Sequence, residues 1–171
     1  MKHLIIIDMQ RDFLNGALAN PDAVAIVPRI KAEIEKAVAN GDNIIFTQDT
    51  HSENYLSTNE GKHLPVVHCV ADTDGWDIEP ELLKATGDYE DVLFIEKRHF
   101  GYDNWKEYIA EGDDVTMCGT CTDICVVSNA LAIKAIEGVE VNVIADCCAG
   151  LSKEKHEHAL DVMASCQCNI I

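Results

Sequence analysis

Long hydrophobic runs are missing from this sequence. A membrane-spanning helix needs about 20 consecutive apolar residues, and no such stretch occurs among the 171 residues. The first apolar run, at residues 4–7, ends at once in Asp8 and is too short for a secretory signal. We therefore expect a cytoplasmic protein without a membrane partner. In that reducing compartment its eight cysteines are expected to be thiols or ligands rather than disulfides.

Basic residues are also scarce. Thirteen Lys and Arg residues stand against 30 Asp and Glu residues, which gives a net charge of −17. Such a surface repels phosphate backbones and anionic lipids, so we expect a small-molecule partner and no nucleic acid. Hydrophobic residues make up 47% and charged residues 25% of the chain, proportions that exclude a disordered protein. This length predicts one domain over residues 1–171.

No repeat, low-complexity tract or linker interrupts the chain. Apolar, β-branched runs instead alternate with stretches of helical periodicity. The predicted strands are 3–8, 43–48, 91–96, 114–119, 139–145 and 167–171, and the predicted helices are 24–40, 80–86, 103–111, 122–137 and 152–165. Continuous apolar strands are typical of parallel sheets that are covered on both faces. The sequence therefore predicts an α/β fold, a three-layer α/β/α sandwich with a mostly parallel sheet of about six strands.

Glycine and proline indicate where the helices begin and end. Gly41 and Gly138 follow the first and fourth predicted helices, at the position that favours glycine. Pro28 lies early in the stretch 24–40, so the regular helix is expected to begin there. Residues 49–79 form a long polar stretch, and a loop of that length in a compact domain is usually functional or disordered.

Chemically active residues follow the predicted strands. In open α/β sheets the ligand crevice lies beyond the carboxyl ends of the strands. The residues expected there are Asp8, Asp49 with His51, Lys97, Cys121 to Cys125, and Asp146. A carboxylate, a lysine and a cysteine are thus predicted at the edge of the sheet where chemistry is expected.

Cys125 is the candidate nucleophile. If a helix begins near Thr122, its macrodipole lowers the pKa of Cys125 and favours the thiolate; the alternative is a small buried core residue. Asp8 suits a proton carrier, or else it caps a turn with Asp12. Lys97 would hold both Asp8 and Cys125 anionic, unless it is a solvated surface charge.

A second candidate site lies in the long polar stretch. Asp49 and His51 form an Asp-x-His pair, His68 follows 17 positions later, and Glu60 lies between them. Such a set of nitrogen and oxygen ligands suits zinc, with iron or manganese as alternatives. The other interpretation is that His51, His63 and His68 are surface histidines of an acidic protein.

The cysteine spacing allows a third interpretation. Cys118 and Cys121 form a C-x-x-C motif between a strand and a helix, as in thiol–disulfide oxidoreductases. A thioredoxin-like fold also needs a cis-proline after the motif, and all four prolines precede it. Redox chemistry is therefore the least favoured alternative.

Aromatic residues make up only 6% of the chain, so those expected near the crevice are informative. Phe13 and Tyr102 are candidates for stacking on a flat substrate, whereas Trp105 is expected to pack in the core.

Five segments of the chain resemble the isochorismatase-like cysteine hydrolases, and within them the nicotinamidases. They are IIDMQRDF at 6–13, TQDTH at 47–51, VHCV at 67–70, EKRHF at 96–100 and GTCTDICV at 119–126. Their order and spacing cover most of the chain.

The resemblance implies an amidohydrolase that cleaves nicotinamide or a similar aromatic carboxamide through a cysteine thioester. It implies a catalytic triad of Asp8, Lys97 and Cys125. It also implies a cis peptide at Thr120–Cys121 that aims backbone N–H groups at the oxyanion. The implied metal ligands are Asp49, His51 and His68, with Glu60 as an additional carboxylate, and the implied assembly is a homo-oligomer.

Two departures from the nicotinamidase pattern leave the substrate open. The loop after Asp49 has the sequence THSENY where Trp-His-Pro is common, so an expected pocket aromatic is missing. Cys121 stands where a small residue or threonine is frequent. The alternative function is a hydrolase of the same fold that acts on an N-carbamoyl or ureido compound or on an isochorismate-like substrate.

Overall fold

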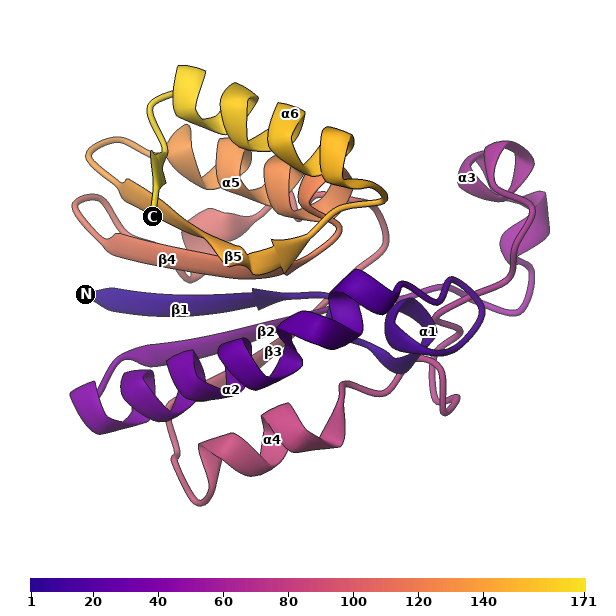
Figure 1. The fold of residues 1–171 in the computed structure, drawn as a ribbon, viewed down its shortest axis with the longest axis horizontal. Coiled ribbons are helices and arrows are strands. Elements are labelled where there is room, and N and C mark those ends of the chain that lie inside the picture. The colour runs from indigo at the N-terminus through magenta and orange to yellow at the C-terminus, as the bar shows by residue number, and fades with distance from the viewer.

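Six strands form one parallel sheet at the centre of the molecule. The computed structural model describes residues 1–171. The strands are β1 (Lys2–Ile7), β2 (Asn43–Asp49), β3 (Val92–Lys97), β4 (Asp114–Thr120), β5 (Glu140–Ala149) and β6 (Asn169–Ile170). Their spatial order is β3-β2-β1-β4-β5-β6, and every neighbouring pair is parallel. The predicted α/β fold is confirmed (Figure 1).

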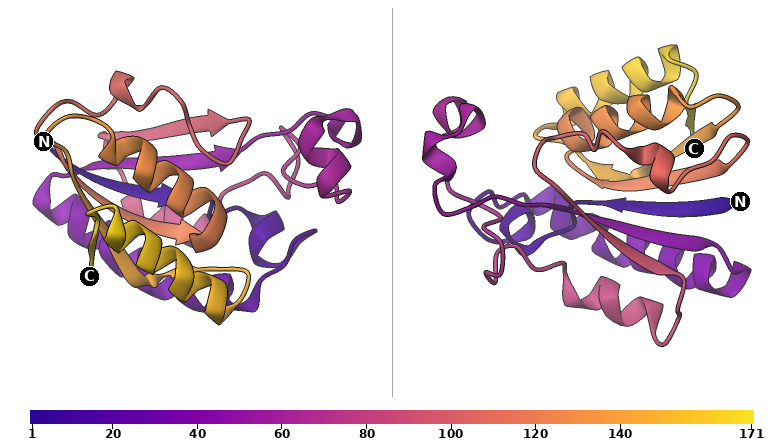
Figure 2. Two further views of the ribbon diagram at one scale, coloured as in Figure 1. Left: turned by 90° about the horizontal axis from the view of Figure 1, so that it is seen from above. Right: turned by 180° about the vertical axis from the view of Figure 1, so that it is seen from behind.

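Helices cover both faces of the sheet (Figures 1 and 2). Helices α2 (Pro21–Asn40) and α4 (Pro80–Thr86) lie on one face, and α5 (Val127–Lys134) and α6 (Lys153–Ser165) lie on the other. The short helices α1 (Arg11–Leu14) and α3 (Asn59–His63) lie beyond the carboxyl ends of the strands. None of these helices is long and apolar enough to cross a membrane.

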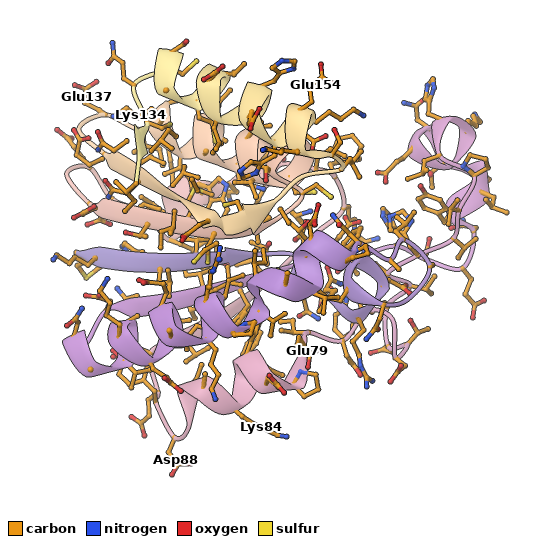
Figure 3. The ribbon with its side chains drawn as sticks, in the orientation of Figure 1. Glu79, Lys84, Asp88, Lys134, Glu137 and Glu154 are labelled. Atoms are coloured by element: carbon orange, nitrogen blue, oxygen red, sulfur yellow. The ribbon has the colours of Figure 1, made fainter.

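Apolar strands make the sheet the centre of the hydrophobic core. The run at residues 4–7 is almost fully buried, and its side chains belong to a cluster of 36 buried residues. Most charged side chains lie on the outer surface, and Asp8, Asp49, Lys97 and Asp113 are the buried exceptions. The charged side chains labelled in Figure 3 project outward from the helices and their flanking turns: Glu79, Lys84, Asp88, Lys134, Glu137 and Glu154.

Helix α2 begins earlier than the sequence predicted. The side chain of Asn20 accepts a hydrogen bond from the backbone N–H of Asp22 and so caps a helix that starts at Pro21. Pro28 lies inside this helix on its exposed face, where water can reach the carbonyl that the proline leaves without a partner. The helix ends at Gly41 in a left-handed conformation, as predicted.

Three other element predictions need correction. The segment predicted as the helix 103–111 contains only a 3₁₀ turn at Trp105–Glu107. Asn129 accepts hydrogen bonds from the Trp105 indole and from the backbone N–H of Tyr102, just before the segment, and Asp113 accepts one from the backbone N–H of Ala110. The helix predicted at 122–137 is a π-helical turn at Thr122–Val126 followed by α5. Strand β5 continues to Ala149, which leaves Asp146 on the strand, exposed beside Arg29.

The chain builds the sheet outward in one direction from β1 to β3 and in the opposite direction from β4 to β6, so the switch point lies between β1 and β4. Ligand crevices of open α/β sheets lie at such a switch point. Asp8 follows β1 with a φ of 47°, in the left-handed region that is strained for a residue other than glycine. Gly119 in β4 pairs with Ile7 and has a φ of 122°. A Cβ atom on Gly119 would lie 2.2 Å from the carbonyl oxygen of Ile7, so this close approach requires glycine.

We expect Gly119→Ala to reduce the free energy of unfolding by about 3 kcal/mol or more, because it combines a backbone clash with an unfavourable φ. Urea denaturation measures the loss. Gly41→Ala is the matched control: Gly41 also has a positive φ, but a Cβ there meets nothing within 4 Å. The control should cost only about 1–2 kcal/mol. Equal losses in the two variants would contradict the close-approach argument.

Candidate active site

Asp8, Lys97 and Cys125 converge at the switch point of the sheet. The Lys97 Nζ atom lies 2.6 Å from Asp8 Oδ2 and 3.7 Å from Cys125 Sγ. All three side chains are buried, with exposed fractions of 0% for Asp8, 2% for Lys97 and 6% for Cys125. A proton acceptor, a fixed positive charge and a thiol thus share one desolvated site.

Burial and charge set the protonation of these three groups. Burial raises the pKa of Asp8, although Lys97 acts in the opposite direction. Burial acts to lower the pKa of Lys97, but Asp8, Cys125 and Asp49 together more than reverse this effect, so the lysine is held charged. Burial and the nearby Asp8 raise the pKa of the Cys125 thiol well above its usual range. The direction of this shift is opposite to the predicted lowering by a helix dipole.

Thr47 on the neighbouring strand orients Asp8. Its hydroxyl donates a hydrogen bond of 2.6 Å to Asp8 Oδ1 and accepts one of 3.1 Å from the Asp8 backbone N–H. This threonine was not predicted as a site residue. It lies within the 47–51 motif, which was the only sequence signal for it.

The four predicted metal-ligating residues come together beside this site. Asp49, His51, Glu60 and His68 each offer one ligand atom, and these atoms all lie within 4.8 Å of one another. His68 donates from Nδ1 to the carbonyl of Val66 at 2.8 Å, which orients its ring so that Nε2 faces the group. The interpretation of these histidines as surface residues is wrong for His51 and His68, which are buried, but His63 is exposed.

The donor set fits a divalent cation. Asp49 Oδ1 is buried without a hydrogen-bond partner, and Asp49 Oδ2 lies 2.9 Å from His51 Nε2 and 3.4 Å from His68 Nε2. Burial acts to raise the pKa of Asp49, but hydrogen bonds from the two imidazoles hold it well below its usual range. An anionic carboxylate with an unpaired oxygen beside two imidazole nitrogens is a suitable ligand set.

Two polar side chains after β1 hold the metal-ligating loop in place. Gln10 accepts a hydrogen bond of 2.7 Å from the backbone N–H of Asp49 and donates one of 2.9 Å to its carbonyl. Asp12 accepts a hydrogen bond of 2.8 Å from the backbone N–H of Cys69, the residue after His68. Both lie in the 6–13 motif, yet their roles depend on contacts more than 30 positions away.

Tyr55 packs against the two metal-ligating histidines. Its ring centroid lies 4.6 Å from that of His51 and 5.0 Å from that of His68, and its side chain is fully buried. Its hydroxyl donates to the carbonyl of Leu64. Phe13 also contacts this group, with its ring centroid 5.6 Å from that of His68. Aromatic rings therefore pack against both metal-ligating histidines.

Tyr102 is placed differently. Its ring packs edge-on against Trp105 and next to Tyr108, and it lines a surface depression that contains no metal-ligating residue. Trp105 is buried in the core, as predicted. Asn129 joins this aromatic cluster to the nucleophile, because it accepts from the Trp105 indole and donates to the carbonyl of Cys125.

The C-x-x-C pair does not form a reactive dithiol in this structure. The peptide bond between Thr120 and Cys121 is cis. Cys118 is fully buried within β4, and this burial raises the pKa of its thiol well above the usual range. Burial also raises the pKa of Cys121, to about 11. All eight cysteines are free thiols.

Comparison with known proteins agrees with this geometry. The family model described as the isochorismatase domain matches residues 2–171. The chain is 26% identical to the nicotinamidase/pyrazinamidase of Mycobacterium tuberculosis, and the match covers 100% of this chain and 98% of that one. It resembles the solved pyrazinamidase/nicotinamidase of Streptococcus mutans with a TM-score of 0.84, 28% identity and 100% coverage of both chains. It also resembles the pyrazinamidase of Pyrococcus horikoshii in complex with zinc, with a TM-score of 0.79, 31% identity, and 99% and 98% coverage of the two chains.

We expect Lys97→Met to destabilise the metal-free protein by about 3 kcal/mol near pH 8, because it leaves a buried carboxylate without its partner. Without Lys97 the folded-state pKa of Asp8 rises further above its unfolded value. A group with a raised folded-state pKa loses its stabilising contribution as pH rises. The loss in Lys97→Met should therefore be smaller near pH 5 than near pH 8.

Urea denaturation at the two pH values measures this difference. Lys36→Met is the control, since Lys36 pairs with Glu33 on the exposed face of α2 and should cost less than about 1 kcal/mol. A loss in Lys97→Met that does not depend on pH would show that the Asp8 carboxylate is not its cause.

Proposed function

The chain belongs to the isochorismatase family, and on that premise we propose that it hydrolyses nicotinamide or a similar aromatic carboxamide to the acid and ammonia. The observation that supports this best is the convergence of Asp8, Lys97 and Cys125 beside the metal-ligating group. The similarity to nicotinamidases and pyrazinamidases over the whole chain favours a carboxamide substrate.

Cys125 is the nucleophile in this proposal, and Asp8 is the base that activates it. Asp8 takes the proton from the thiol as Sγ forms a bond to the amide carbon. The same proton then goes to the departing nitrogen, which leaves as ammonia, and an acyl thioester remains on Cys125. Asp8 next takes a proton from water, which attacks the thioester, and the acid product leaves as the thiol is restored. The raised pKa of Asp8 suits a group that accepts and returns one proton in each step.

Lys97 keeps the charge of the site balanced. Its ammonium lies between Asp8 and the thiol, so it orients the base and stabilises negative charge that develops on either group. We further propose that the backbone N–H groups of Cys121 and Cys125 bind the oxyanion of the tetrahedral intermediate.

We propose zinc as the metal, held by Asp49, His51, Glu60 and His68. The zinc complex of the Pyrococcus horikoshii relative supports this choice, and the nitrogen and oxygen donors suit zinc. A bound divalent ion would supply a Lewis acid that orients a donor atom of the substrate. Phe13, whose ring lies beside His68, is the residue that we propose to contact the substrate ring.

We expect the purified, reduced and zinc-supplemented protein to release ammonia from nicotinamide, and Cys125→Ala to abolish this activity because no thioester can form. A coupled ammonia assay measures the rate. Cys166→Ala, at the exposed end of α6, is the matched control and should retain full activity. Residual turnover in Cys125→Ala equal to that of the control would exclude the cysteine mechanism.

We also expect the protein, once a chelator has removed any metal and has itself been removed, to bind one zinc ion per chain. His68→Ala should weaken this binding by about 100-fold or more, because it removes one ligand. Equilibrium dialysis with metal analysis measures the stoichiometry and the affinity. His158→Ala removes an exposed histidine of α6 and should leave both unchanged. If His68→Ala bound zinc as tightly as the control, the ion would have to bind elsewhere.

A further inference from the structure

A pocket of about 560 Å³ opens beside the metal-ligating group. One wall is the arm, which we define as residues 52–67; it contains α3 and projects from the carboxyl end of the sheet (Figure 1). The opposite wall is the turn at residues 98–100, directly after β3. His51 and Glu60 line the pocket, so it is continuous with the metal-ligating group.

Lys97 connects this pocket to the nucleophile. Its Nζ atom lies 3.2 Å from the carbonyl oxygen of His99 and 3.7 Å from Cys125 Sγ. The backbone carbonyl of Lys97 accepts a hydrogen bond from Thr50, which also lines the pocket. The turn that forms the second wall is thus fixed to the same lysine that contacts the reactive thiol.

Arg98 differs from the other arginines of this protein because it has no acidic partner. The chain has only three arginines, against 30 acidic residues. Arg11 and Arg29 form ion pairs with Asp74 and Asp146. Arg98 lines the pocket and is exposed. Its side chain forms no ion pair and no hydrogen bond, even though the chain is strongly acidic. Its guanidinium is therefore available to an anion from solution.

Polar side chains also line the rest of the pocket. Only two of its 11 lining residues, Leu64 and Phe100, are hydrophobic. His99 follows Arg98 on one wall and His63 lies in the opposite wall, and each offers an imidazole to the pocket. The acidic group of this lining, Glu60, lies 3.6 Å from His51 and 3.8 Å from His68. Because Glu60 faces these two imidazoles, the pocket lacks a counter-ion for Arg98.

We infer that the preferred amide has a carboxylate or other anionic group, which Arg98 binds in this pocket while the amide carbon reaches Cys125. This inference rests on the proposed amide hydrolysis and specifies the substrate class. Arginine is suited to this task because its planar guanidinium can donate two parallel hydrogen bonds to one carboxylate. A neutral carboxamide then remains a substrate, but a poorer one than its anionic counterpart.

Matched pairs of amides test the inference. We would measure kcat/KM for ammonia release from 3-carbamoylbenzoate, 4-carbamoylbenzoate and N-carbamoylglycine, each against its uncharged methyl ester, with nicotinamide as a neutral reference. In at least one pair the acid should be favoured about tenfold, as expected for a charge-assisted hydrogen bond. The preference should fall as the salt concentration rises from about 20 mM to about 500 mM, because Arg98 is solvent-exposed.

Three variants separate the role of Arg98 from general effects. Arg98→Gln should lower the acid-to-ester ratio of kcat/KM about tenfold, and Arg98→Lys should retain part of the preference. Arg29→Gln, on the exposed face of α2, should keep the wild-type ratio.

The outcomes distinguish this inference from the proposed function. If nicotinamide and the esters are hydrolysed but no acid is preferred, or if the preference persists in Arg98→Gln, the inference is overturned and the amidase proposal stands. If no amide releases ammonia from the zinc-loaded, reduced protein, both fail together. A preference for an acid that is lost in Arg98→Gln and kept in Arg29→Gln supports the inference.

Discussion

The buried ammonium of Lys97 is the interaction on which the rest of the site depends. It lies 2.6 Å from Asp8 and 3.6 Å from Asp49, and it contacts Cys125. An uncompensated buried charge costs several kcal/mol, so neither the lysine nor the carboxylates are stable there alone. Because Lys97 contacts both carboxylates, it joins the proposed nucleophile Cys125 and the proposed metal-ligating group into one electrostatic unit.

The two buried carboxylates, Asp8 and Asp49, have pKa values that are shifted in opposite directions. Burial raises the pKa of Asp8, whereas hydrogen bonds from His51 and His68 hold that of Asp49 far below its usual range. A group with a raised pKa can accept and return a proton near neutrality, while a group with a lowered one remains an anionic ligand. The different neighbours of the two strand ends, rather than the residue type, therefore determine which aspartate suits the role of the proposed base.

Local sequence patterns were sufficient to predict the parallel sheet and the residues that follow its strands. Asp8, Asp49 and Lys97 lie at strand ends because apolar runs stop there, and parallel strands place their ends at one edge. The helix predicted at 103–111 is wrong, and the segment is tied instead to Asn129 of a distant helix, a contact that the local pattern does not contain. The pKa of Cys125 was wrongly predicted because burial is a tertiary property that no local motif contains. Tyr55 was missed for the same reason, since its importance arises from packing against His51 and His68.

The short segment after β1, residues 8–13, fixes the position of the polar loop at residues 50–79. Residues 50–79 form no strand of the sheet, so their positions depend on side-chain contacts. Gln10 fixes the backbone at Asp49, and Asp12 fixes it at Cys69, next to His68. Both side chains follow Asp8 within four positions, and the same segment ends in Phe13. A shift of this segment would therefore move the proposed base Asp8, the proposed metal ligands Asp49 and His68, and Phe13 together, which makes the 6–13 motif a single structural unit.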